Sequence, residues 1–324
     1  MLIALIIVAI IFLIFYRHRE KSYNKGATPG NLRKYEEELK RSEKTIEINP
    51  NDAKAWYDKG VKFGNLGKHK EELKRSEKTI EINPNDAKAW YGKGVEFANL
   101  GKYKEELKCY EKAIEINPND AKTWYGKGVA LANLGKYEEA LQCYEKAIKI
   151  NPDDAKAWYG KGVKFGNLGK HKEELKCYEK AIEINPKFAK TWYGKGVALA
   201  NLGKYEEALQ CYEKAIEINP NDANAWYNKG AALANLRKHQ EALECFEKAI
   251  EINPNHAEAW YGKGVALGKL GKHDEALKCY EKALEINPNF AKAWYGKGTA
   301  LKSSGRATES EKCFAEAKKL GTWR

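Results

Sequence analysis

Cysteine and histidine are the side chains in this sequence that could hold a metal ion or form a disulfide, and both recur at a fixed spacing. The seven cysteines stand 34 residues apart, and four histidines share another position of the same period. These residues are Cys109, Cys143, Cys177, Cys211, Cys245, Cys279, Cys313, and His69, His171, His239, His273. Equivalent positions in stacked helix pairs lie about 10 Å apart, whereas a disulfide needs Cα atoms within about 7 Å. No CxxC motif occurs, so we expect structural thiols, no metal and no cofactor.

Catalytic groups do not occur in any recognisable arrangement. The sequence has no nucleophile beside a general base and no phosphate-binding loop, and its glycines fall at predicted helix contacts or turns. A tryptophan recurs every 34 residues from Trp56 to Trp294, and this period leaves no room for a catalytic domain. The sequence therefore predicts a protein that is not an enzyme and takes no small-molecule substrate.

The net charge of +12 is spread along the chain. Lysine and glutamate alternate on the same predicted helices, as in KYEEALQCYEKA from Lys136. Nucleic-acid affinity depends on how many phosphates clustered Lys and Arg neutralise together. We interpret the charges as solvated helix faces and expect no nucleic-acid partner.

Each 34-residue period predicts a helical hairpin. In residues 121–154, AKTWYGKGVALANLGKYEEALQCYEKAIKINPDD, Gly135 interrupts one helical run and Pro152 ends another. Asp154 can cap the helix that follows. The result is two amphipathic helices of about 14 residues joined by a tight turn. Neither helix can bury its apolar face alone, so stability must come from neighbouring copies.

This pattern resembles the tetratricopeptide repeat family. The residues that carry the resemblance are Trp124, Gly128, Leu131, Gly135, Tyr137, Ala140, Tyr144, Ala147 and Pro152. The eight matching copies lie at 53–86, 87–120, 121–154, 155–188, 189–222, 223–256, 257–290 and 291–324. The resemblance implies an all-α, right-handed superhelix whose concave surface, lined by the first helices, binds peptides or partner proteins.

The two ends of the array depart from the pattern. Residues 19–52 form a degenerate half-repeat, in which Pro29 breaks the first helix and a second helix of about 33–48 docks on the next repeat. In the last copy Ser304, Glu311 and Lys318 replace apolar residues. Polar residues at these positions are expected to solvate a terminal face.

The first sixteen residues, MLIALIIVAIIFLIFY, are apolar and precede a basic cluster. A helix of this length spans about 24 Å, somewhat less than the hydrocarbon core of a bilayer. We interpret residues 1–18 as a single transmembrane anchor with its basic flank. The basic residues from Arg17 to Lys25 predict an N-terminus outside and cytoplasmic repeats. A cleaved signal peptide, giving a secreted or periplasmic protein, and an interfacial helix stay open.

Two sets of charged residues fall on faces that are otherwise apolar. One lysine recurs in each first helix, and we expect its stem to pack while its ammonium group reaches an edge or a neighbouring glutamate. This set is Lys59, Lys93, Lys127, Lys161, Lys195, Lys229, Lys263 and Lys297. Glu38, Glu72, Glu106 and Glu174 replace a small residue at a helix contact, so their carboxylates should be paired or turned outward.

Three further sets of residues share the remaining face of the first helices and are our candidates for a binding groove. Tyrosine offers rigid contact area, asparagine can bond a peptide backbone, and lysine favours acidic partners. The tyrosine ladder is Tyr57, Tyr91, Tyr125, Tyr159, Tyr193, Tyr227, Tyr261 and Tyr295. The asparagine file is Asn65, Asn99, Asn133, Asn167, Asn201 and Asn235, and the lysine file is Lys54, Lys88, Lys122, Lys156, Lys190 and Lys292. Tandem duplication alone would also produce these rows.

These features favour a membrane-anchored scaffold that binds protein or peptide partners of acidic character in its groove. The alternative is a targeting or import receptor, or an envelope-assembly factor, that binds many substrates transiently. A single defined partner, as opposed to many transient ones, would separate the two.

Overall fold

The computed structural model describes residues 29–65 and 67–321, and these form seventeen α-helices without a strand. The first helix described is α2 (Pro29–Ile48). The first helices of the eight repeats are α3 (Ala53–Asn65), α5 (Ala87–Asn99), α7 (Ala121–Asn133), α9 (Ala155–Asn167), α11 (Ala189–Asn201), α13 (Ala223–Asn235), α15 (Ala257–Lys269) and α17 (Ala291–Ser303). Their second helices are α4 (His69–Ile82), α6 (Tyr103–Ile116), α8 (Tyr137–Ile150), α10 (His171–Ile184), α12 (Tyr205–Ile218), α14 (His239–Ile252), α16 (His273–Ile286) and α18 (Ala307–Lys319). The predicted all-α class is confirmed for this part of the chain.

The turn and cap residues of the sequence set the helix boundaries. Gly135 adopts a φ of 77° between α7 and α8, a left-handed conformation that glycine tolerates best. The carboxylate of Asp154 accepts hydrogen bonds from the backbone N–H groups of Lys156 and Ala157, which confirms the predicted cap of α9. The indole of Trp124 donates to the carbonyl of Pro118 at 2.8 Å, which ties the first helix to the loop before it.

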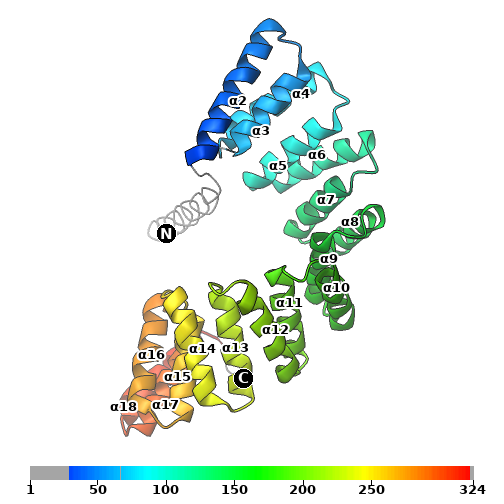
Figure 1. Ribbon diagram of the computed structural model, residues 1–324. Helices are drawn as coiled ribbons and strands as arrows, with labels where there is room; N and C mark the ends of the chain where they lie inside the picture. Colours follow the sequence, from blue (N-terminus) through cyan, green and yellow to red (C-terminus); the bar gives the residue numbers. More distant parts are fainter. Residues whose placement is uncertain (1–28, 66, 322–324) are drawn as a thin grey trace. The chain divides into compact units, whose positions relative to one another are not determined.

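The chain divides into two compact units, one ending at Pro152 and the other beginning at Asp153. Within each unit the two helices of a repeat pack together, and the second helix then packs against the next first helix (Figure 1). Consecutive first helices also contact each other, as α3 does α5 and α13 does α15, but no consecutive second helices of either unit do. The first helices therefore lie on the inner side of each unit.

In most second helices a buried aromatic residue packs against glycines of the first helices, whereas α4 carries Ser76 at this position. The ring of Tyr110 is 3% exposed and lies between Gly94 of its own repeat and Gly126 of the next. A Cβ added at these glycines would stand 2.6 and 2.9 Å from the ring. Burying such a side chain stabilises the fold by roughly 1.5–3 kcal/mol. The glycines are thus required because they let an aromatic ring fill the space between helices.

The N-terminal predictions are tested only in part. Helix α2 begins at Pro29, about four residues earlier than predicted, because proline is favoured at the first position of a helix. It packs against α3, as the predicted docking requires. The predicted membrane anchor, residues 1–18, lies outside the described residues. Within the part of the chain that the structure describes, no helix is both long enough and apolar enough to span a bilayer.

The recurrent lysines of the first helices behave as predicted. Seven of the eight ammonium groups pair with a glutamate on the preceding second helix, at 2.8–3.3 Å. The pairs are Lys59–Glu43, Lys93–Glu77, Lys127–Glu111, Lys195–Glu179, Lys229–Glu213, Lys263–Glu247 and Lys297–Glu281. These lysines are therefore part of the contact between repeats and do not line the groove.

Candidate functional site

The first helices of each unit present the three candidate rows along their inner side. Within one helix the file lysine, the ladder tyrosine and the file asparagine stand three and then eight residues apart, as in Lys122, Tyr125 and Asn133. At about 100° per residue, these spacings place all three on one face of the helix. The rows therefore share one surface within each unit.

The tyrosine ladder is not the unpacked face that the sequence predicted. Seven of its members are only half-exposed, since each ring also packs against its own hairpin. Seven ring pairs have centroids 5.2–6.2 Å apart: Tyr91–Tyr110, Tyr125–Tyr144, Tyr159–Tyr178, Tyr193–Tyr212, Tyr227–Phe246, Tyr261–Tyr280 and Tyr295–Phe314. Burial raises the pKa of Tyr57, Tyr91, Tyr159, Tyr193, Tyr227 and Tyr261. These tyrosines stabilise the hairpins and present one edge to the groove.

The ladder tyrosines lie at the seam between consecutive first helices. The amide of Asn228 in α13 donates to the hydroxyl of Tyr193 in α11 at 3.0 Å. A Cβ added at Gly92 in α5 would stand 3.8 Å from the ring of Tyr57 in α3. Tyr295, in the first helix of the last repeat, is 42% exposed. Tyr57 and Tyr193 are therefore partly covered by the next repeat.

The asparagine file is mostly exposed, as a row of backbone-binding amides must be. Asn133, Asn167, Asn201 and Asn235 are exposed. Asn99 differs, because it is half-buried and its amide donates to Glu96 at 3.2 Å. The side chain of Asn65 lies outside the described residues.

The lysine file is exposed in both units. None of Lys54, Lys88, Lys122, Lys156, Lys190 and Lys292 forms a salt bridge within the described part of the chain. The recurrent lysines five residues further on in each first helix are by contrast paired with glutamates. The file is thus a row of available positive charges on the inner side.

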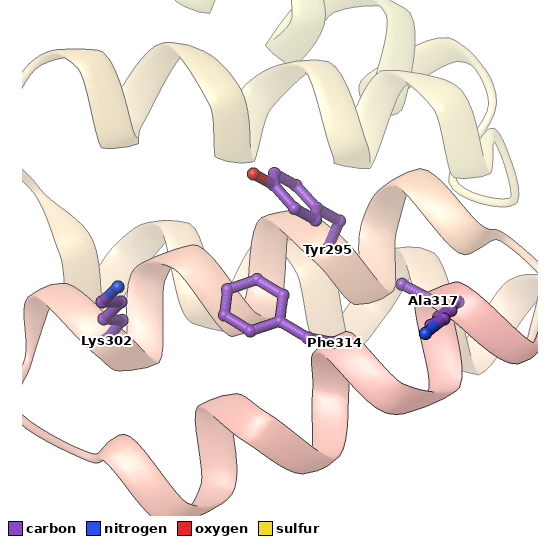
Figure 2. Close-up of a pocket in the computed structure, with 5 residues that line it drawn as sticks. Tyr295, Lys302, Phe314 and Ala317 are labelled. Atoms are coloured by element: carbon purple, nitrogen blue, oxygen red, sulfur yellow. The ribbon is translucent and has the colours of Figure 1, made fainter. Parts of the chain in front are cut away.

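Two cavities adjoin the ladder. One, of about 160 Å³, is lined by Tyr57, Val61, Glu72, Ser76, Tyr91, Gly92 and Val95. The other, of about 330 Å³, lies in the last repeat beside Tyr295, Lys302, Phe314, Ala317 and Lys318. Figure 2 shows the rings of Tyr295 and Phe314 over this second cavity. Glu311 and Lys318 of the last repeat are exposed, as expected for a solvated face.

The contact glutamates Glu72 and Glu106 are not turned outward; Glu72 is hydrogen-bonded to Glu96 and Glu106 to Tyr110. Both are buried, and one carboxylate oxygen of each has no hydrogen-bond partner. Burial is the main cause that raises the pKa of Glu72 to about 9 and of Glu106 to about 7. Glu174 is also buried but is paired, since it accepts from the Tyr178 hydroxyl at 3.2 Å and contacts His171 at 2.9 Å. Glu38 pairs with Lys62.

One buried carboxylate was not foreseen. Glu96 is 2% exposed and lies 2.6 Å from Nδ1 of His69, a residue of the preceding repeat. Five other repeats carry alanine at the position of Glu96: Ala130, Ala198, Ala232, Ala266 and Ala300. The replacement of this alanine by Glu96 is the feature of the sequence that indicates an unusual contact here. Its partner could not be read from the sequence, because the contact crosses from one repeat to the next.

The cysteines are free and buried. Burial raises the pKa of Cys109, Cys143, Cys211, Cys245 and Cys279 to about 11. A thiol with so high a pKa is a poor nucleophile and metal ligand at neutral pH. Their burial in the contacts between helices is what a structural role requires.

Comparison with known families matches six consecutive repeats, residues 87–290, to the family described as tetratricopeptide repeat. A second profile of that description matches residues 279–312. No curated protein matches the chain.

Several solved structures share the fold. YrrB, described as a TPR protein with an unusual peptide-binding site, is 31% identical over 59% of this chain and 98% of its own, with a TM-score of 0.51. A tetratricopeptide repeat protein from Parabacteroides merdae is 19% identical over 72% of this chain and 93% of its own, with a TM-score of 0.58. The APC/C hetero-tetramer Cut9-Hcn1 is 18% identical over 90% of this chain and 57% of its own, with a TM-score of 0.60.

Proposed function

This chain belongs to the tetratricopeptide repeat family, and we propose that it is a non-catalytic scaffold that binds extended segments of partner proteins along its first helices. Members of this family generally act in protein interactions, and the similar protein YrrB is described as having a peptide-binding site. The observation that carries the proposal is the inner face of the first helices, where exposed lysines and asparagines flank the half-buried tyrosines.

The exposed lysine file favours partners of acidic character. Long-range attraction between a row of lysines and an acidic segment speeds association and fixes its orientation. The exposed amides of the asparagine file can bond the peptide backbone, which has donors and acceptors of its own. The edges of the ladder tyrosines supply apolar contact area between these two rows.

The proposal is tested by titrating fluorescein-labelled peptides of graded acidic content with the full chain in detergent and following anisotropy. We expect acidic peptides to bind, and to bind more weakly as salt rises. The triple variant Lys54→Glu, Lys88→Glu, Lys122→Glu should weaken binding at least about 10-fold.

A matched control separates local contacts from net charge. The triple variant Lys74→Glu, Lys108→Glu, Lys146→Glu changes the net charge equally, but these exposed lysines stand on second helices. It should shift the dissociation constant less than about 2-fold. Equal effects of the two triple variants, or binding that ignores acidic content, would contradict the proposal.

We further propose that residues 1–18 anchor the protein in a membrane, with the N-terminus outside and the repeats in the cytoplasm. The support is the apolar run before the basic cluster in the sequence. Protease added to intact cells should spare the repeats, and digestion without lysis would contradict this orientation. Release of the repeats as a processed soluble protein would favour a signal peptide.

A further inference from the structure

The cluster around Glu96 joins two repeats of the N-terminal unit. His69 is the first residue of α4, and Glu72 follows it one helical turn later. Glu96 reaches both from α5 of the next repeat. One imidazole nitrogen and one oxygen from each carboxylate all lie within 4.8 Å of one another. Three ligand-type side chains thus converge at the contact between hairpins.

With both carboxylates ionised, as in a metal-bound state, the cluster would hold more negative charge than His69 can balance. Glu72 is 9% exposed and Glu96 is 2% exposed, so both carboxylates are removed from water. The Oε2 atom of Glu72 is buried without a hydrogen-bond partner. His69 can supply at most one positive charge, and its Nδ1 already contacts Glu96. Adjacent buried carboxylates are unfavourable unless a proton or a cation neutralises them.

The donor set identifies the cation. Imidazole nitrogen suits first-row transition metals, and carboxylate oxygen binds them as well. The amide nitrogen of Asn99 lies 3.2 Å from Glu96 and 3.4 Å from His69, so its amide oxygen would become a fourth ligand only after the amide turns over. Ligands at about 2.1 Å from a tetrahedral metal are roughly 3.4 Å apart, so small side-chain rotations suffice. We propose that His69, Glu72 and Glu96 bind one divalent transition metal ion such as Zn²⁺.

The other histidines of this repeat position provide an internal comparison. His171 and Glu174 form the same pair one helical turn apart, at 2.9 Å. The residue equivalent to Glu96 is Ala198, so this copy lacks the third ligand. Three residues after His239 and His273, at the position of Glu72, the chain has Ala242 and Ala276. These copies therefore lack the second ligand as well. Within the described residues, the proposal therefore predicts one ion per chain at this position.

The bound ion would have two structural consequences. It would link α4 to α5 and so stiffen the contact between the repeats at 53–86 and 87–120. It could enter through the cavity of about 160 Å³, which Glu72 lines together with the ladder residues Tyr57 and Tyr91.

The test is calorimetric titration of Zn²⁺ into the metal-free full chain, together with thermal unfolding. We expect one equivalent to bind and to raise the unfolding temperature. Glu96→Ala, Glu72→Ala and His69→Tyr each install the residue that this chain itself uses at the equivalent position of other repeats. These variants should therefore fold. Loss of an outer-shell partner weakens metal binding by about 10- to 100-fold. Each of these variants removes a direct ligand and should therefore weaken Zn²⁺ binding by more than that.

Two controls make the result specific. His171→Tyr and Glu174→Ala alter the incomplete copy of the site and should leave stoichiometry and affinity unchanged. Co²⁺ bound in place of Zn²⁺ should show no sulfur-to-metal charge-transfer band, since no cysteine is a ligand. Absence of stoichiometric binding, binding that survives Glu96→Ala, or a thiolate band would each overturn the proposal.

Discussion

Replacing Glu106 by alanine should change the stability of the chain in a direction that depends on pH. The side chain is 2% exposed, and burial raises its pKa from 4.5 to about 7, although the hydroxyl of Tyr110 partly opposes this. The folded chain therefore binds this proton more tightly than the unfolded chain. The stabilisation that this bound proton gives to the folded chain is fully present below pH 4.5 and is lost as pH rises through about 7.

The magnitude follows from this difference in pKa. At about 1.4 kcal/mol for each pKa unit, burying the charged carboxylate costs roughly 3 kcal/mol above pH 7. Alanine removes that charge but also one methylene group, which contributes about 0.8 kcal/mol. Glu106→Ala should therefore stabilise the chain by roughly 2–3 kcal/mol at pH 8 and be close to neutral at pH 5. Between these pH values its effect should change by about 2.5 kcal/mol.

Urea unfolding followed by circular dichroism at pH 5 and pH 8 measures this change. Glu105→Ala is the matched control, since Glu105 is the exposed neighbour in the same helix. Its effect should differ between the two pH values by less than about 0.5 kcal/mol. An effect of Glu106→Ala that is equal at pH 5 and pH 8 would refute the reasoning, because the carboxylate would then not be buried in its charged form.

Four further outcomes test the structure of the repeats. Gly264→Ala should destabilise the chain by about 1–3 kcal/mol, because the new Cβ would stand 2.7 Å from the ring of Tyr280. A Cβ added by Gly268→Ala in the same helix would meet nothing closer than 3.9 Å, so this variant should stabilise the chain by up to about 1 kcal/mol through helix propensity. Arg237 has a φ of 62° where other repeats mostly carry glycine, so Arg237→Gly should stabilise by about 1 kcal/mol in thermal unfolding. The buried cysteines with a pKa of about 11 should react with iodoacetamide at pH 8 at least about 100-fold more slowly than in urea, as counted by mass spectrometry.

Local signals in the sequence were sufficient for the helical hairpins. Gly135 marks a turn and Pro152 marks the end of a helix, and both act on residues close to them in the sequence. Helices α7 and α8 end where these two residues predict. The recurrent lysines were also predictable, since a charged head on an apolar face must reach a partner.

Contacts between repeats were harder to predict. The tyrosine ladder was expected to be unpacked, but Tyr125 lies against Tyr144 because the ring is large enough to span both helices. Glu96 was overlooked because its partner His69 is 27 residues away, on the preceding hairpin. A helical wheel describes one helix and cannot show which faces meet across a stack.

The central claim, that partners bind along the inner side of the first helices, is tested most directly by site-specific crosslinking. A photoreactive residue is placed at Asn133, exposed on the inner face of α7, or at Gln142, exposed on α8. The probe is the acidic peptide that binds most tightly in the anisotropy titration. Our account predicts capture from Asn133 that excess unlabelled peptide suppresses, and none from Gln142. Capture from Gln142 alone, or equally from both positions, would contradict it.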